Sequence, residues 1–381
     1  MGYSFTAGGG RPHTCAAVTA AVALLTAAHA DTVQKKDVDA ASPTTAVYSL
    51  PPSSLRSKQS IAIDDYWTAV VKAMPPNGCG TFVGKNATEI AATRKCQAES
   101  FYKIPYYTDL LKLYQVRLVD ATMGGVPVEI VTPSGGIAAR NSNRVLISLH
   151  GGGFIDGSRT YSRLEAIPVA AVGRIKVVSV DYRMAPIYKF PAASEDVEAV
   201  YRELLKTYDP KSIGIFGCSA GGLLTAESIA WLQSKNVPLP GAVGMFCSGG
   251  AHWSEGDSAQ FSALWQEKVP QPARDDAYFK NVDFNDPLAF PVRSKEVMAK
   301  FPPSLLIAST RDHALSSVVY THTMLVRQKV PAQLYIWEGM YHAFVGDPLL
   351  PEAQEAYDVI AKFFDQNLRV PGTVSQIDSK H

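Results

Sequence analysis

The stretch Ser212–Ala226, SIGIFGCSAGGLLTA, is the part of the sequence from which the fold is best inferred. An apolar run rich in β-formers opens it and a helical pattern begins at Leu223, so the glycines between them predict an abrupt turn from strand to helix. Gly217 and Gly221 fit such a turn because a β-carbon at either position would clash across it. Ser219 lies at the apex, where the backbone is strained and the positive N-terminus of the next helix favours a developing anion.

The pattern G-x-S-x-G also arises by chance in ordinary glycine-rich turns, so its meaning depends on the rest of the chain. The composition is globular: 381 residues, 46% hydrophobic and 19% charged, favour one large domain with an accessory subdomain. Lys and Arg (36) balance Asp and Glu (35), which gives no reason to expect a nucleic-acid partner. The sequence holds no C-x-x-C or H-E-x-x-H spacing, and we expect neither a metal nor an organic cofactor.

Residues 1–30 have the features of a secretory signal peptide. Arg11 supplies a basic charge, Cys15–Ala28 is apolar and small, and Ala28-His29-Ala30 matches the A-x-A cleavage pattern. This apolar run is too short to span a membrane, and no later stretch reaches the needed length. The sequence therefore predicts export to the periplasm or the medium, with cleavage near Ala30 and no permanent membrane anchor.

Four cysteines follow the predicted signal peptide. Cys79 and Cys96 share a polar, loop-rich region, where they either form a disulfide or remain two separate thiols; the sequence leaves both open. Cys218 and Cys247 fall on predicted core segments and are expected to be small buried residues. Asn86-Ala87-Thr88 is a formal glycosylation sequon, relevant only in a host that glycosylates exported proteins.

Residues 31–113 are expected to form an N-terminal extension and part of a helical cap. Their first half is polar, and a helical pattern over Ile61–Lys112 is broken by Pro75-Pro76 and Gly78–Gly80. At the other end, residues 370–381 are polar and are expected to form a flexible tail.

From Tyr114 onward, short β-rich runs alternate with segments of helix length. The predicted strands are 114–119, 126–132, 144–149, 175–180, 212–216, 242–246, 304–308 and 333–337. The first two form a hairpin across Gly124-Gly125. Near-continuous apolar strands separated by helices are typical of a mostly parallel sheet covered on both faces. The sequence therefore predicts an α/β fold over residues 114–369, with an eight-stranded, mostly parallel sheet flanked by helices.

One interval, residues 249–302, is too long for a simple crossover between strands. It contains Trp253, Phe261, Trp265 and Tyr278. We expect this insertion to form helices that stand over the sheet edge and contribute to the cap and the pocket, because long insertions at such an edge usually line a binding site.

The run His150-Gly151-Gly152-Gly153-Phe154 directly follows the predicted strand 144–149. Glycines there let backbone N–H groups face a cavity with no side chain in the way, as an oxyanion hole requires. The position also fits, because open α/β sheets bind ligands at the carboxyl ends of their strands. A merely flexible loop is the alternative. His150 is expected to orient the loop and not to carry a proton.

A serine nucleophile needs a general base, and His342 is the expected one because it lies in a loop just after the last strand, at the same sheet edge as Ser219. The histidines set aside include His13 and His29 in the signal peptide, His252 in the insertion and His322 in a helical stretch.

The base in turn needs an acid that holds its tautomer and stabilises the imidazolium. Asp312 lies just beyond the end of a strand and is the expected partner, with Glu338 and Asp286 as alternatives. The resulting chain order, serine, aspartate and histidine, is that of the α/β-hydrolases.

Taken together, these motifs resemble the hormone-sensitive-lipase-like branch of the α/β-hydrolases, the bacterial family IV esterases. The matching motifs, over roughly residues 144–364, are HGGGF at His150, DYRMAP at Asp181, GCSAGG at Gly217, RDHA at Arg311 and GMYHAF at Gly339. The resemblance implies a catalytic triad, an oxyanion hole and a cap built from the N-terminal helices and part of the insertion. The implied residues are Ser219 as nucleophile, His342 as base, Asp312 as acid, and the backbone N–H groups of Gly152, Gly153 and Ala220 as oxyanion donors.

Three features depart from the family pattern. Cys218 precedes the serine where the family usually has Asp or Thr, and Ile187 follows Ala-Pro where the family has an acidic residue. The N-terminal region matches only in outline, so the cap and the substrate are the least defined parts.

The function expected from the sequence is a serine carboxylesterase that hydrolyses small, short-to-medium-chain esters through an acyl-enzyme. The same machinery serves lactones, amides and carbamates, and these remain open. A non-catalytic small-molecule binding protein of the same fold is the alternative from another class. The sequence also leaves open whether the protein is a monomer or a homodimer.

Overall fold

The computed structural model describes residues 50–64, 78–80, 82, 85–262 and 277–370. The predicted signal peptide 1–30, Trp265 and nearly all of the predicted tail 370–381 lie outside these residues, so the predictions about them stay predictions. Among the described residues, no helix is long and apolar enough to span a bilayer.

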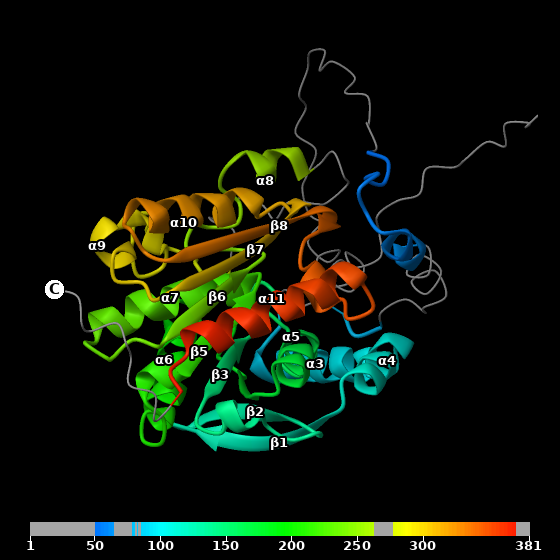
Figure 1. Ribbon diagram of the computed structural model, residues 1–381, viewed down its shortest axis with the longest axis horizontal. Coiled ribbons are helices and arrows are strands. Elements are labelled where there is room, and N and C mark those ends of the chain that lie inside the picture. The colour runs from blue at the N-terminus through cyan, green and yellow to red at the C-terminus, as the bar shows by residue number, and fades with distance from the viewer. Residues whose placement is uncertain (1–49, 65–77, 81, 83–84, 263–276, 371–381) are drawn as a thin grey trace, which may run out of the picture.

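An eight-stranded sheet forms the centre of the molecule (Figure 1), as predicted. The strands are β1 (Val116–Met123), β2 (Val126–Pro133), β3 (Val145–Leu149), β4 (Lys176–Val180), β5 (Ile213–Cys218), β6 (Ala242–Phe246), β7 (Ser304–Arg311) and β8 (Ala332–Tyr341). They lie in the order β1-β2-β4-β3-β5-β6-β7-β8. β2 pairs antiparallel with both β1 and β4, and the other neighbours are parallel. This is the predicted α/β-hydrolase architecture.

Five strands, β1, β2, β5, β7 and β8, end later than the sequence pattern suggested, and β5 and β8 show the cause. β5 continues to Cys218 because Gly217 and Cys218 still pair with Met245 and Phe246 of β6. β8 continues to Tyr341, which pairs with Arg311 of β7. In both cases pairing with a neighbouring strand continues beyond the predicted strand end, so both strand ends lie next to the predicted site residues.

Helices cover both faces of the sheet. Their bounds are α3 (Ala87–Phe101), α4 (Pro105–Leu113), α5 (Tyr161–Gly173), α6 (Ala192–Leu204), α7 (Ala220–Ser234), α8 (Asp257–Phe261), α9 (Lys295–Met298), α10 (Leu315–Arg327) and α11 (Pro351–Asn367). Short 3₁₀ turns lie at Ala139–Asn141, Pro210–Ser212, Pro291–Arg293 and Phe344–Gly346. Figure 1 shows α11 crossing one face of the sheet, where it packs beside α5.

The alternation of side chains along β3 shows how one strand serves two cores. Val145, Ile147 and Leu149 join the core shared with α6, α7 and α10, whereas Leu146 joins the core shared with α4, α5 and α11. Each is essentially inaccessible to solvent. Burial of such a side chain contributes about 1.5–3 kcal/mol, so β3 is held between the two helix layers through both of its faces.

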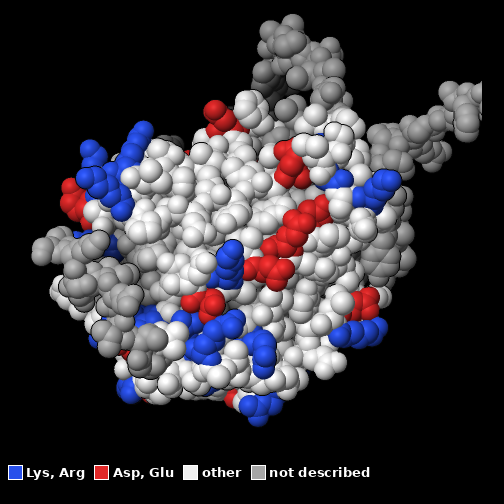
Figure 2. All heavy atoms as spheres, in the orientation of Figure 1, with Lys and Arg blue, Asp and Glu red and all other residues white. Residues whose placement is uncertain are grey.

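The outer surface carries charges of both signs. On the face drawn in Figure 2, acidic side chains run along α11, and Lys and Arg side chains gather beside them. The expectation that the protein has no nucleic-acid partner stays a prediction.

The N-terminal helices are joined to the sheet domain by packing and by hydrogen bonds. Cys79 and Cys96 form a disulfide with a Cα–Cα separation of 5.5 Å, which decides between the two states left open by the sequence.

Asn86, the residue of the sequon, is the N-cap of α3: its side chain accepts from the Glu89 N–H in a capping box. In α4, the Tyr106 hydroxyl donates to the Gly346 carbonyl at 2.7 Å. The division into a cap and a catalytic domain stays a prediction.

The described part of the insertion holds less helix than expected; the expectation for residues 263–276 lies outside the described residues. Its described part, residues 249–262 and 277–302, is mostly turns, and α8 and α9 have only five and four residues. The side chains of Asp283 and Asp286 accept the backbone N–H groups of Asn285 and Leu288 at 2.9 and 2.8 Å. Such local side-chain hydrogen bonds offer the backbone an alternative to helical hydrogen bonds, which favours turns over a helix at residues 283–288.

Candidate active site

Ser219 occupies the turn between β5 and α7 with backbone angles φ 58° and ψ −123°. This is a left-handed conformation that non-glycine residues seldom adopt, and a hydrogen bond from the Ser219 N–H to the Phe246 carbonyl at 2.8 Å helps to hold it. A β-carbon on Gly217 or Gly221 would lie 2.2 or 1.8 Å from the Leu149 carbonyl oxygen. Both glycines are therefore required, and the elbow has the predicted form.

Three side chains from different loops meet at this elbow. His342 Nε2 lies 2.8 Å from Ser219 Oγ, and His342 Nδ1 lies 2.7 Å from Asp312 Oδ1. Because an ionised carboxylate can only accept, Nδ1 carries the proton and Nε2 is left to accept from the serine hydroxyl. The Asp312 side chain is 1% exposed and that of His342 is 10% exposed, so the histidine–aspartate pair is shielded from water.

The meeting depends on an irregularity between the last two strands. The β7–β8 register shifts between Ser309 and Arg311, and the Thr310 hydroxyl accepts the Gly339 N–H at 2.8 Å. Such a bulge bends the strand and redirects the residues that follow it. Asp312 follows this irregularity, and its Oδ1 accepts the Ala314 N–H at 2.8 Å as well as contacting His342.

The other titratable residues considered from the sequence lie elsewhere. Glu338 is exposed and accepts from the Ser53 hydroxyl at 3.1 Å, and Asp286 caps a turn in the insertion. His252 is buried with its Nδ1 2.7 Å from Ser254 Oγ, and His322 lies on α10. The structure thus brings Asp312, and neither alternative acid, to His342.

The glycine loop after β3 faces the elbow. Gly152 and Gly153 have φ of 111° and 61°, and a β-carbon on Gly152 would lie 2.1 Å from the Asp156 carbonyl oxygen. The Gly152 carbonyl instead accepts the N–H groups of Ile155 and Asp156. This tight turn orients the Gly152 and Gly153 amides as candidate oxyanion donors, beside the N–H of Ala220 at the start of α7.

Comparison with known proteins agrees with this geometry. Residues 146–346, more than half of the chain, match the family described as alpha/beta hydrolase fold. The chain belongs to this family. An acetyl-hydrolase of Streptomyces hygroscopicus is 27% identical over 251 residues, which cover 64% of this chain and 80% of the relative.

Solved structures place this α/β hydrolase more narrowly. The crystal structure of an esterase E25 has a TM-score of 0.70 at 29% identity and covers 88% of this chain and 100% of that one. An esterase from the bacterial hormone-sensitive lipase family gives 0.65 at 26% identity and covers 75% and 94%. The predicted membership of the hormone-sensitive-lipase-like branch is confirmed.

His150, the first residue of the glycine motif, is inaccessible to solvent in this hydrolase. Its ring stacks on Tyr182 with centroids 4.2 Å apart, and its Nδ1 lies 2.7 Å from the Gly151 carbonyl oxygen. The Tyr182 hydroxyl donates to the His150 carbonyl at 2.6 Å. Burial lowers the pKa of His150 to about 4, so the ring is neutral at the pH of most assays. These contacts support the expected role of orienting the loop.

Acid should therefore destabilise this hydrolase between about pH 6.5 and pH 4 through His150. Its pKa lies below the usual histidine value of about 6.5, so the unfolded chain binds the extra proton and stability falls as the pH falls. At pH 5 the loss is about 2 kcal/mol relative to pH 7.5. In His150→Asn, the amide N–H can replace Nδ1–H but does not titrate. We expect the same change from pH 7.5 to pH 5 to lower its free energy of unfolding, measured in urea, by about 2 kcal/mol less than that of the wild type. Equal drops in both proteins would contradict the assignment.

Cys218 and Ile187, two of the three departures from the family pattern, have different surroundings. Cys218 is buried beneath the elbow, and burial raises the pKa of its thiol well above the usual value. A protonated, enclosed thiol is a poor nucleophile, so Cys218 does not compete with Ser219. Ile187 is 40% exposed.

Two residues near the site were not predicted from the sequence. His313 stacks on His342 with ring centroids 4.2 Å apart, and its position directly after Asp312 is the only sequence signal for it. Arg94 of α3 donates to the carbonyl oxygens of Ile155 and Ala185 at 2.6 and 2.8 Å. Nothing local in the sequence marks Arg94, because both of its partners are more than sixty residues away in sequence.

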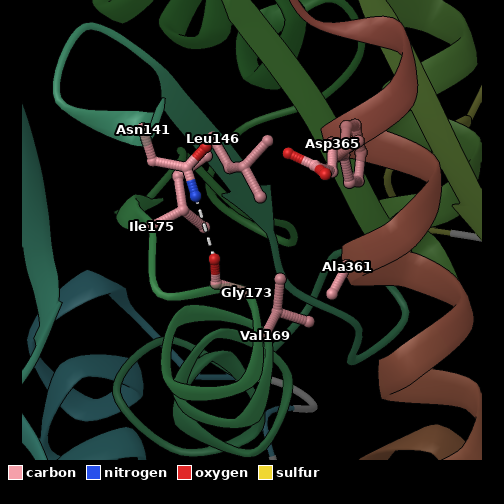
Figure 3. Close-up of a pocket in the computed structure, with 8 residues that line it drawn as sticks. Asn141, Leu146, Val169, Gly173, Ile175, Ala361 and Asp365 are labelled. Carbon is pink, nitrogen blue, oxygen red and sulfur yellow. Dashed lines mark hydrogen bonds between the residues drawn. The ribbon is translucent and has the colours of Figure 1, made fainter. Parts of the chain in front are cut away.

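A separate small pocket lies at the amino ends of the central strands, away from the site (Figure 3). It is lined by Asn141, Leu146, Val169, Gly173, Ile175, Ala361, Phe364 and Asp365. The Asn141 side-chain amide donates to the Gly173 carbonyl at 2.9 Å across it. Its volume of about 10 Å³ holds one water at most. Ser219 follows the carboxyl end of β5, so this pocket has no part in the proposed chemistry.

Proposed function

We propose that this protein is a serine carboxylesterase that hydrolyses small, short-to-medium-chain carboxylic esters through an acyl-enzyme. Its broader class, a carboxylic ester hydrolase of the α/β-hydrolase family, is established by the comparisons above. The observation that carries the finer proposal is the continuous hydrogen-bonded line from Ser219 through His342 to Asp312, next to the glycine loop.

In the first half of the reaction, His342 Nε2 accepts the proton of Ser219 as Oγ attacks the ester carbonyl carbon. The resulting oxyanion is held by the N–H groups of Gly152, Gly153 and Ala220, which are fixed before the reaction begins. Asp312 stabilises the imidazolium. When the tetrahedral intermediate collapses, the C–O bond to the alcohol breaks and His342 returns the proton to the departing alcohol oxygen.

In the second half, His342 accepts a proton from water, and the hydroxide oxygen attacks the acyl carbon of the Ser219 ester. The same N–H groups hold the second oxyanion. Collapse releases the carboxylic acid, and the proton on Nε2 returns to Ser219 Oγ. The enzyme regains its starting state, and neither step needs a metal or an organic cofactor.

The size of the substrate is inferred from the surroundings of the glycine loop. Phe154 is fully buried and stacks face to face on Tyr278 of the insertion, with centroids 4.1 Å apart. Arg94 ties α3 to the carbonyl of Ile155, the next residue. Elements from both halves of the predicted cap are thus anchored beside the oxyanion loop, which limits the room for a long acyl chain. The acetyl-hydrolase relative supports the same inference.

The proposal is tested with p-nitrophenyl esters from acetate to palmitate, hydrolysed by residues 31–381 and by Ser219→Ala in parallel. We expect kcat/KM to be highest among the short chains and to fall by about tenfold or more toward palmitate, because each further methylene must fit a bounded pocket. A maximum at the longest chains would contradict the size inference. If no ester is cleaved although a fluorophosphonate still labels Ser219, the substrate is a lactone, an amide or a carbamate. Stoichiometric ligand binding without labelling would indicate a binding protein.

A further inference from the structure

A buried carboxyl group, Glu165 of α5, connects the two backbone segments that form the proposed site. Its Oε1 accepts the Gly151 N–H at 2.8 Å, and its Oε2 accepts the Cys218 N–H at 3.3 Å. Gly151 directly precedes the two loop glycines of the oxyanion hole, and Cys218 directly precedes the nucleophile. One side chain therefore holds both segments at the residue before the reacting groups.

Strand pairing fixes the separation of the two segments only up to their last pair of residues. β3 and β5 are parallel neighbours, and Leu149 and Gly217 are their last paired residues. Beyond this point the backbones diverge into the glycine loop and the elbow, where strand pairing no longer sets their spacing. The two hydrogen bonds to Glu165 lie just beyond that last pair, where strand pairing no longer holds the two backbones at a fixed distance.

The contact geometry favours a role for both carboxyl oxygens. Each oxygen accepts one backbone N–H, and both protonation states of a carboxyl group allow this because the hydroxyl oxygen of the neutral form can also accept. Burial raises the pKa of Glu165 to about 8, while the Gly151 and Cys218 N–H groups and then His342 act in the opposite direction. Neither the oxyanion hole nor the triad uses this group, so a buried carboxyl at this place calls for another function.

We propose that Glu165 is a positioning residue that fixes the distance between the oxyanion loop and the nucleophile by bridging Gly151 and Cys218. This inference rests on the proposed function. Its importance follows from how strongly acyl transfer depends on geometry: donors must meet the oxyanion at about 2.7–3.1 Å, and a misplacement of about 1 Å costs on the order of a hundredfold in rate.

Glu165→Gln is the main test. Its amide oxygen can accept one N–H, but its NH₂ group faces the other N–H donor, so one end of the bridge is lost at nearly constant volume. We expect kcat to fall by about 10- to 100-fold, with KM within about threefold of the wild-type value. Affinity for a boronic acid that forms a tetrahedral adduct on Ser219 should fall by a similar factor, because that adduct needs the oxyanion hole.

Two further variants separate positioning from the mere presence of a carboxyl group and from general stability. Glu165→Asp keeps the carboxyl group but is one methylene shorter, so it cannot reach both amides and should lose a similar factor. Glu227→Gln is the matched control: Glu227 is another buried glutamate, on α7, that accepts from the Ser194 hydroxyl, and its loss should leave kcat within about twofold. If Glu165→Gln does not fold, Glu165→Asp gives the same test.

The outcomes are distinct. If Glu165→Gln keeps kcat and boronate affinity within twofold of wild type, or if Glu165→Asp restores them fully, the positioning role is refuted. If the wild type cleaves no ester, the proposed function fails separately, and the rate of Ser219 labelling by a fluorophosphonate replaces kcat. That rate needs the nucleophile and the oxyanion hole but no ester, and we expect it to fall in Glu165→Gln and not in Glu227→Gln.

Discussion

Replacing Ser219 by alanine should lower kcat for p-nitrophenyl acetate by about 10⁵- to 10⁶-fold and abolish fluorophosphonate labelling. The reason is that Ser219 Oγ, 2.8 Å from His342 Nε2, is the proposed nucleophile, so no covalent intermediate forms without it. The residual rate comes from the oxyanion hole and from substrate binding, which persist when a triad member is removed. The measurement is a labelling gel beside steady-state kinetics on the purified variant.

The fold should survive this substitution. Alanine keeps the β-carbon that Ser219 already carries at φ 58°, so the turn gains no new strain. Ser254→Ala is a suitable control, because Ser254 Oγ also lies 2.7 Å from a histidine nitrogen, that of His252, yet far from the elbow in sequence. It should retain both labelling and turnover. Labelling that persisted in Ser219→Ala would show that another residue is the nucleophile.

The parts of the site that were predicted from the sequence are those whose chemistry is local. Glycine at 217 and 221 is the only residue that leaves space for the Leu149 carbonyl, and positive φ at Gly152 and Gly153 needs the same residue type. Strands that are apolar on both faces could likewise be recognised, because burial between two helix layers imposes that pattern. These constraints act within a few residues, so they are visible in the order of amino acids.

The parts that could not be predicted depend on contacts between distant segments. Glu165 looks like any polar residue of a helix until α5 packs behind both strand ends, and its partners lie 14 and 53 residues away in sequence. The disulfide between Cys79 and Cys96 was left open because spacing alone does not show whether two α-carbons approach each other. In the described part of the insertion, side chains of aspartates that accept nearby backbone N–H groups favour turns at residues 283–288, where a helix was expected.

The Asp312→Ala variant should lose about 10⁴-fold in kcat. Asp312 Oδ1 accepts from His342 Nδ1 at 2.7 Å in a site where the carboxyl is 1% exposed, so its removal leaves the imidazole without an orienting partner and the imidazolium without a counter-charge. The two effects can be separated. Asp312→Asn keeps an oxygen that can accept from both His342 and the Ala314 N–H, as Oδ1 does now, but it lacks the charge.

We therefore expect the kcat of Asp312→Asn to lie between those of Asp312→Ala and the wild type. The ratio of the wild-type kcat to that of Asp312→Asn then measures the contribution of the negative charge. Glu338→Ala provides the control for the competing assignment. Glu338 is four residues from His342 in sequence but exposed and bonded to Ser53, so its loss should change kcat by less than about twofold. If Glu338→Ala lost as much activity as Asp312→Ala, the acid would have been assigned to the wrong residue. Glu338 of β8 would then be the acid, and His342, just after the same strand, would remain the base. The register shift between β7 and β8 that precedes Asp312 would then have no catalytic consequence.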